Sequence, residues 1–66
     1  MTPAQVDTWV NDIRILASDA EAAHKSEDDL YLALLTAIAE GRCKDPAECA
    51  RVAIQSKNIA FHRWCA

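Results

Sequence analysis

The sequence predicts an all-α fold, a three-helix bundle that forms a single small domain over residues 1–66. Two observations support this prediction: apolar residues recur at helical spacing, and three helix-start signatures divide the chain. In each signature a capping side chain stands three residues before an acid or an amide, so that both can bond amides at the helix start. Two signatures also have proline at the first helical position, where its missing N–H is not needed. The signatures are Thr2-Pro3-Ala4-Gln5, Ser26-Glu27-Asp28-Asp29 and Asp45-Pro46-Ala47-Glu48.

The first helix is expected from about Pro3 to Ala23 or His24. Its apolar residues recur at spacings of three and four and form one continuous stripe: Val6, Trp9, Val10, Ile13, Leu16, Ala17 and Ala20. Ile15 lies almost opposite this stripe, where solvent is expected. Single exposed apolar residues are common, so Ile15 is either an ordinary surface residue or part of a contact surface.

The second helix is expected from about Glu27 to Glu40, after a corner at His24–Lys25. It is apolar almost all round, so it has to be covered on most sides and is the predicted centre of the fold. Gly41 follows as the left-handed residue that ends many helices. Residues 41–45 are therefore the predicted loop before the third helix.

The third helix begins after Asp45, and the sequence leaves its end open. A single helix that continues to Trp64 would place its apolar residues on one broad stripe. Alternatively, residues 55–58 break the helix and Asn58 caps a short fourth C-terminal helix. Serine and asparagine favour caps and turns over helix interiors, which favours the broken segment.

The charge is distributed unevenly along the chain. Residues 1–40 carry eight acidic side chains against two basic ones, whereas residues 41–66 carry five basic side chains against two acidic ones, for a net charge of −3. An acidic part and a basic part influence the choice of partner. No apolar run approaches the roughly 18 residues of a membrane span, and the N-terminus lacks the pattern of a secretory signal. We therefore expect a cytoplasmic protein with no membrane partner.

No motif in the sequence specifies a catalytic chemistry, and we expect neither an enzyme nor a bound cofactor. A chain of this size is too small to enclose a typical substrate cavity. One set of side chains could be considered for a metal: Cys43, Cys49, His62 and Cys65. Its spacing argues against zinc, because structural zinc sites usually bring one pair of ligands two to four residues apart. Whether Cys43 and Cys49 form a disulfide is left open.

The run Phe61-His62-Arg63-Trp64 is the most suggestive surface in the sequence, because tryptophan and arginine are frequent binding hot spots. Phe61 and Trp64 have a second interpretation, in which they close the end of the bundle. Trp9, on the flank of the first helix's apolar stripe, has the same two interpretations.

Three short stretches resemble the helix-turn-helix of resolvases and of phage small terminase subunits: Ala37-Ile38-Ala39-Glu40-Gly41, Glu48-Cys49-Ala50-Arg51 and Phe61-His62-Arg63-Trp64. The resemblance covers residues 37–64 and implies a recognition helix. The residues it would place against DNA are Lys57, Asn58, His62 and Arg63. The net charge of −3 disfavours phosphate contacts, although the local basic charge of the C-terminal part does not.

In its length, acidic helical character and lack of a catalytic motif, the chain is also similar to small accessory proteins of temperate phages, which include anti-defence and anti-CRISPR proteins. This similarity implies a non-catalytic protein that binds and inhibits a host or defence protein in the host cytoplasm. A basic partner surface could be engaged by acidic residues, namely Asp12, Asp19, Glu27, Asp28 and Asp29. The candidate partner-binding residues are Trp9, Asp12, Ile15, Asp19, Phe61, Arg63 and Trp64. A DNA-binding regulator and a homodimeric structural module are the alternatives.

Overall fold

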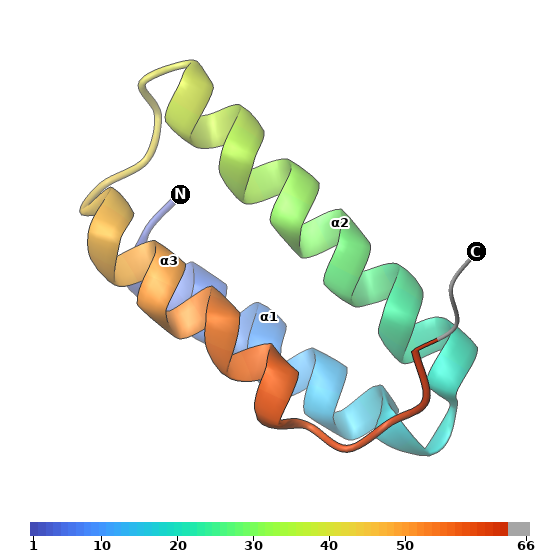
Figure 1. Ribbon diagram of the computed structural model, residues 1–66. Coiled ribbons are helices and arrows are strands. Elements are labelled where there is room, and N and C mark those ends of the chain that lie inside the picture. The colour runs from blue at the N-terminus through green and yellow to red at the C-terminus, as the bar shows by residue number, and fades with distance from the viewer. Residues whose placement is uncertain (64–66) are drawn as a thin grey trace.

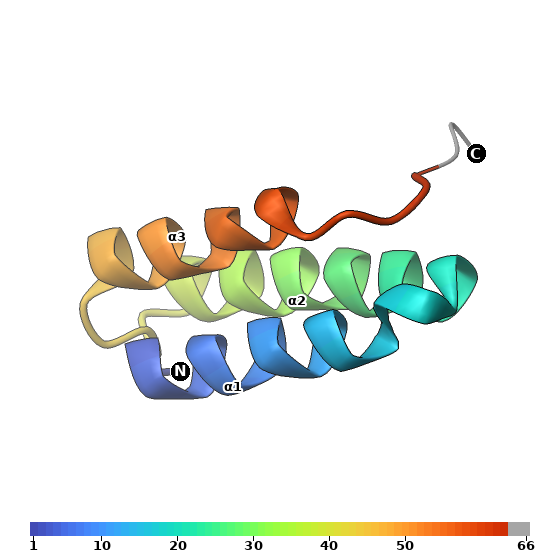
Figure 2. The same cartoon turned by 90° about the horizontal axis from the view of Figure 1, so that it is seen from below.

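Three packed helices form the protein, which is described by a computed structural model over residues 1–63 (Figure 1). Helix α1 spans Pro3–Ile15, α2 spans Ala20–Ala39 and α3 spans Pro46–Ile54. Two short 3₁₀ helices, η1 (Leu16–Ser18) and η2 (Gln55–Asn58), follow α1 and α3. The three α-helices lie side by side (Figure 2), and the described residues contain no strand. The predicted all-α three-helix fold is confirmed.

The first helix begins where the sequence predicts. Thr2 has extended backbone angles, and its hydroxyl accepts a hydrogen bond from the amide of Gln5 at 3.2 Å. The Gln5 side chain accepts in turn from the amide of Thr2 at 3.0 Å, which completes the capping box. Pro3 occupies the first helical turn. The capping box therefore bonds the backbone amides of both Thr2 and Gln5 at this helix start.

The boundary between the first two helices was predicted in the wrong place. Helix α1 ends at Ile15 rather than near Ala23, and α2 begins at Ala20 rather than at Glu27. Asp19 is the cap: its backbone is extended, at φ −113° and ψ 91°, and its carboxylate accepts from the amide of Ala22. The expected cap Ser26 lies inside α2, where the backbone amides are bonded along the helix and need no cap.

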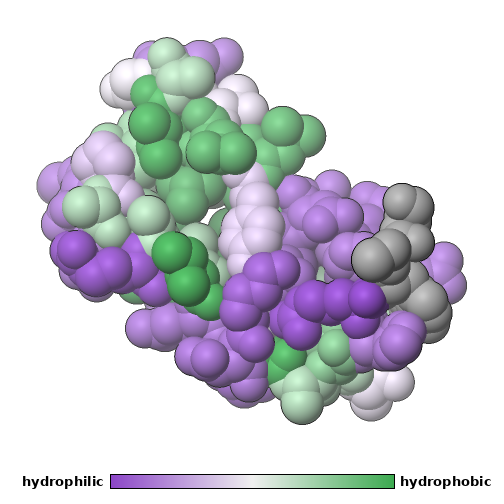
Figure 3. Space-filling model, in the orientation of Figure 1, coloured by the Kyte–Doolittle hydropathy of each residue, from purple (hydrophilic) through white to green (hydrophobic). Residues whose placement is uncertain are grey.

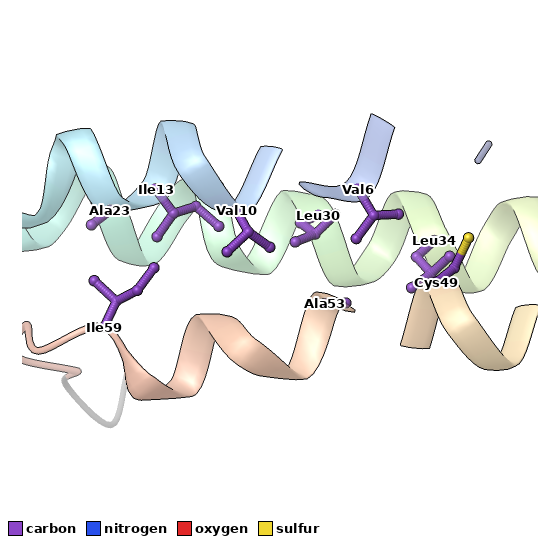
Figure 4. Close-up of a cluster of buried hydrophobic side chains, with 9 residues drawn as sticks. All are labelled: Val6, Val10, Ile13, Ala23, Leu30, Leu34, Cys49, Ala53 and Ile59. Atoms are coloured by element: carbon purple, nitrogen blue, oxygen red, sulfur yellow. The ribbon is translucent and has the colours of Figure 1, made fainter. Parts of the chain in front are cut away.

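The core lies between all three helices. Its α1 side chains, Val6, Val10 and Ile13, belong to the predicted stripe and are at most 1% exposed. They meet side chains of α2 and α3 and one residue that follows η2 (Figure 4). The cluster consists of Val6, Val10, Ile13, Ala23, Leu30, Leu34, Cys49, Ala53 and Ile59.

The loop after α2 and the start of α3 follow the prediction. Gly41 has a φ of +72°, the left-handed conformation that glycine adopts without strain. Asp45 caps α3 by accepting a hydrogen bond from the amide of Glu48 at 3.3 Å, and Pro46 follows it. The loop is fastened to the N-terminus, because the Lys44 amide donates to the Met1 carbonyl at 2.8 Å.

The third helix is broken, as the second of the two interpretations predicted. Helix α3 ends at Ile54, and residues 55–58 form the tighter turn η2. Residues 59–63 are not helical, so Asn58 does not cap a fourth helix within the described residues. This segment instead crosses the end of the bundle, where Ile59 is buried and Phe61 packs against the core.

Candidate interaction surface

A buried carboxylate, that of Glu27, fastens the segment after α3 to the first half of α2. The Glu27 side chain is 1% exposed and accepts four hydrogen bonds from three residues of the chain's last part. The Arg63 guanidinium donates through Nε to Oε1 at 2.9 Å and through Nη2 to Oε2 at 3.0 Å. Ser56 Oγ donates to Oε2 at 2.7 Å, and Lys57 Nζ donates to Oε1 at 3.1 Å. The expected role of Glu27, an exposed acid that meets a basic partner, is therefore wrong.

The balance of burial and hydrogen bonding keeps Glu27 ionised. Burial by itself raises the pKa of this carboxyl, because it disfavours the charged form. The hydrogen bonds from Arg63, Ser56 and Lys57 and the charge of Arg63 outweigh it and lower the pKa from 4.5 to about 2. Above that pH the site is a charged network with its donors and acceptors paired.

Arg63 is a structural residue in this network. Its guanidinium also donates to the backbone carbonyls of Ser56 at 2.9 Å and Ile59 at 3.3 Å. It lies over the ring of Phe61, with 3.8 Å between the central carbon and the ring centroid. Phe61 and Arg63, two of the candidate partner-binding residues, are therefore partly buried within the fold. Trp64, a third, lies outside the described residues.

The Trp9 side chain also makes its contacts within the molecule. Its indole Nε1 donates to the backbone carbonyl and to the hydroxyl of Ser26, at 3.1 Å each. The ring is partly buried and packs against the core. Of its two interpretations, the structure therefore favours packing between α1 and α2.

The other candidates on α1 lie at the surface. Ile15 is 78% exposed, as the sequence predicts, and Asp12 is exposed as well. Asp19 is exposed but serves as the cap of α2. Asp28 and Asp29 are exposed too and lie one helical turn from His24 and Lys25, with which they pair at 3.6 and 2.9 Å.

The residues of the helix-turn-helix resemblance do not form a recognition helix. Lys57 and Asn58 lie in η2, whereas His62 and Arg63 lie in the non-helical segment after it. Lys57 is paired with Glu27, and its ammonium also lies 5.3 Å from the centroid of the Tyr31 ring. The structure therefore brings Lys57 and Arg63 together on a buried carboxylate and does not align the four residues on one helix face.

The cysteines near α3 are free thiols. Cys49 is buried and Cys43 is partly exposed, and both sulfurs lie near the Lys44 carbonyl, at 3.3 and 3.9 Å. Burial, together with the neighbouring Cys43, raises the pKa of the Cys49 thiol. No three histidine, cysteine or acidic side chains of residues 1–63 are close enough to hold a metal ion. Cys65 lies outside the described residues.

An apolar surface that the sequence analysis did not single out runs along α2 and α3. We call it the α2–α3 face and define it by four exposed side chains: Leu32 at 67%, Leu35 at 65%, Ile38 at 38% and Ile54 at 63%. Figure 3 shows apolar surface over the C-terminal half of α2 and over part of α3. Between the two helices lies an open groove of about 350 Å³. Its lining is almost entirely apolar: Tyr31, Leu34, Leu35, Ala50, Ala53, Ile54 and Lys57.

The signal for this face was present in the sequence. A short helix that is apolar all round was expected to be covered on most sides, but α2 is covered by α1 and α3 on one side only. Its buried residues recur as Ala23, Glu27, Leu30, Leu34 and Ala37, which is a single helical stripe. The apolar residues off this stripe are the ones left on the surface.

Comparison of the chain with models of protein families, with curated proteins and with solved structures finds no match. Among residues 1–63, no helix has the length and apolar character needed to cross a membrane. The α2–α3 face is therefore the feature of the described residues from which we infer a function.

Proposed function

We propose that this protein is a non-catalytic binding protein that acts by occupying a surface of a macromolecular partner through its α2–α3 face. The observation that supports this proposal is the concentration of exposed aliphatic side chains beside an apolar groove. Scattered apolar residues are normal on a protein surface, whereas a contiguous patch is typical of an interaction site. Leu35 and Ile54 line the groove from opposite helices, so a side chain from a partner could insert between them.

The position of the proposed site differs from the one expected from the sequence. Trp9, Phe61 and Arg63 hold the fold together, whereas the α2–α3 face makes few contacts within the molecule. Such a face loses little stability when it is substituted, which suits a surface used for binding. A protein of this kind modulates its partner by covering the partner's own binding surface, as an inhibitor does.

The proposal is tested with a photo-activatable cross-linking residue placed at position 35 in the full-length chain, in cells that express it. The matched control carries the same residue at position 15, because Ile15 is more exposed than Leu35, at 78% against 65%, but lies on α1 and does not line the groove. We expect a discrete cross-linked product from position 35 that position 15 does not give. Equal or absent cross-linking at the two positions would contradict the proposal.

A further inference from the structure

Two free thiols, those of Cys43 and Cys49, lie close together where the loop after α2 meets α3. We propose that this pair is a thiol–disulfide exchange site, at which a small-molecule disulfide oxidises the two thiols to an internal disulfide and a small-molecule thiol reduces it again. Neither cysteine lines the groove of the α2–α3 face. The exchange site is therefore independent of the proposed function.

The contacts of the two sulfurs place them within reach of each other. Cys43 Sγ lies 3.9 Å and Cys49 Sγ lies 3.3 Å from the same atom, the carbonyl oxygen of Lys44. The Cys43 side chain also forms a hydrogen bond with the Cys49 thiol. A disulfide forms without movement of the backbone only where two side chains already approach each other. We therefore expect side-chain rotation to join the two sulfurs while the helices stay in place.

The backbone on either side of the pair is fixed by hydrogen bonds. Next to Cys43, the Lys44 amide donates to the Met1 carbonyl at 2.8 Å, which fastens the loop to the N-terminus. In the first turn of α3, the Cys49 amide donates to the Asp45 carbonyl at 3.0 Å. The fold therefore holds the two thiols at a high effective concentration, which favours a reaction between them over a second reaction with solvent.

The difference in exposure gives the two thiols different roles. Cys43 is partly exposed, whereas Cys49 is 0% exposed. Burial and the neighbouring Cys43 raise the pKa of the Cys49 thiol. Because the thiolate is the nucleophile, Cys49 is protected from direct reaction with an oxidant. Cys43 is therefore the thiol that meets the oxidant, and Cys49 completes the internal disulfide.

The exchange consists of two balanced steps. The Cys43 thiolate attacks one sulfur of the small-molecule disulfide, whose S–S bond breaks, and one small thiolate leaves with the bonding electrons. Cys49 then loses its proton, attacks the Cys43 sulfur and displaces the second small thiolate. In total the protein gives up two electrons and two protons, which convert the small-molecule disulfide into two thiols. In a reducing compartment the pair stays a dithiol, and it is oxidised when the ratio of disulfide to thiol rises.

The first experiment treats the full-length protein with glutathione disulfide, stops exchange with acid and measures the masses of the products. Cys65 lies outside the described residues, and Cys65→Ser is present throughout so that only the pair can react. We expect protein that has lost two hydrogens and carries no glutathione. Cys49→Ala should instead stop at the mixed disulfide between Cys43 and glutathione. Cys43→Ala should react at least about tenfold more slowly, because its remaining thiol is buried. Far-UV circular dichroism establishes that the variants are folded.

The second experiment leaves both cysteines in place and measures whether the fold favours their oxidation. The protein is equilibrated with mixtures of glutathione and its disulfide, once in native buffer and once in denaturing urea. We expect the equilibrium constant for the internal disulfide to be about tenfold or more higher in native buffer. By linkage, the oxidised protein should then unfold at a higher urea concentration than the reduced protein, and a reductant should restore the original midpoint.

Three results would overturn the exchange site. One is glutathione attached to the parent protein in place of the internal disulfide, and another is equal reaction of Cys43→Ala and Cys49→Ala. The third is an equilibrium constant in native buffer that is no higher than in urea, because the fold would then not hold the thiols for exchange. None of them affects cross-linking at position 35, which tests the proposed function separately.

Discussion

Replacing Glu27 by glutamine tests whether the buried carboxylate stabilises the fold. Glutamine has nearly the shape of the protonated carboxyl but no charge, so Glu27→Gln imitates protonation without leaving a cavity. Arg63 and Lys57 then lose the charge that they surround, and the amide NH₂ faces donors in place of an acceptor. We expect a folded but clearly less stable protein at neutral pH.

The pKa supplies the magnitude of this loss. The pKa of Glu27 falls from 4.5 to about 2 on folding, and each pKa unit corresponds to about 1.4 kcal/mol. The charged carboxylate therefore contributes about 3 kcal/mol to stability at pH 7. This agrees with the roughly 3–5 kcal/mol lost when one partner of a buried ion pair is removed. A domain of this length has about 3–10 kcal/mol in total, so Glu27→Gln should remove a large part of it.

Urea denaturation followed by far-UV circular dichroism measures the effect at several pH values. Because folding lowers the pKa, the contribution is fully present above pH 4.5 and is lost as the pH falls from 4.5 towards 2. The parent and the variant should thus differ by about 3 kcal/mol at pH 7 and converge near pH 2. Other acids affect both proteins equally, so the difference between the two curves isolates Glu27.

Asp28→Asn is the matched control, because Asp28 is the next residue and is 68% exposed. It should change the free energy of unfolding by less than about 0.5 kcal/mol at neutral pH. The reasoning is refuted if Glu27→Gln is as stable as the parent at pH 7. A difference that stays constant down to pH 2 would refute the electrostatic explanation in particular.

Three further substitutions test local features of the fold, each by urea denaturation. Asp45→Ala should cost about 1–2 kcal/mol, because it removes the cap of α3 and places alanine at a φ of +56°. Asp45→Asn keeps the cap, tolerates this conformation and should stay close to the parent; equal losses would contradict this. Gly41→Ala should cost about 1 kcal/mol through its φ of +72° alone, since an added Cβ meets nothing within 4 Å; an unchanged midpoint would show that the loop adjusts. Trp9→Phe should cost at least about 1 kcal/mol, because it removes the hydrogen bonds to Ser26 and part of a ring that packs against the core, and a neutral result would contradict both contributions.

Local signals in the sequence were sufficient to predict where α1 and α3 begin. Thr2 and Asp45 cap helices as predicted, because each cap depends only on the residues that follow it within one turn. The Ser26 signature failed because the same residue pattern also occurs inside helices, where neighbours along the chain already bond the amides. The actual break at residues 16–18 contains neither glycine nor proline. It is followed by Asp19, whose carboxylate caps α2, a local signal that the sequence analysis did not use.

The candidate site was less predictable than the fold. Nothing near Glu27 in the sequence shows that its partners lie 29 to 36 residues away. Its position four residues after Ala23 and three before Leu30 does place it on the buried stripe of α2, but only once α2 is known to begin at Ala20. The error at the helix boundary therefore hid the buried carboxylate. It also left Lys57 and Arg63 available for roles in binding, whereas in the structure both bond the buried Glu27 carboxylate.

We expect the Glu27 network to make folding of the chain cooperative. A hairpin of α1 and α2 alone would present this carboxylate on its apolar face with none of the donors from residues 56–63. That local conflict disfavours the hairpin as a separate folding intermediate, because consistent local and long-range contacts are what make a partly folded state persist. We therefore expect the two halves of the chain to fold together, with Glu27 hydrated until its donors from residues 56–63 are in place. Chains shortened before Arg63 are therefore expected to expose their apolar helices and to be removed by proteolysis.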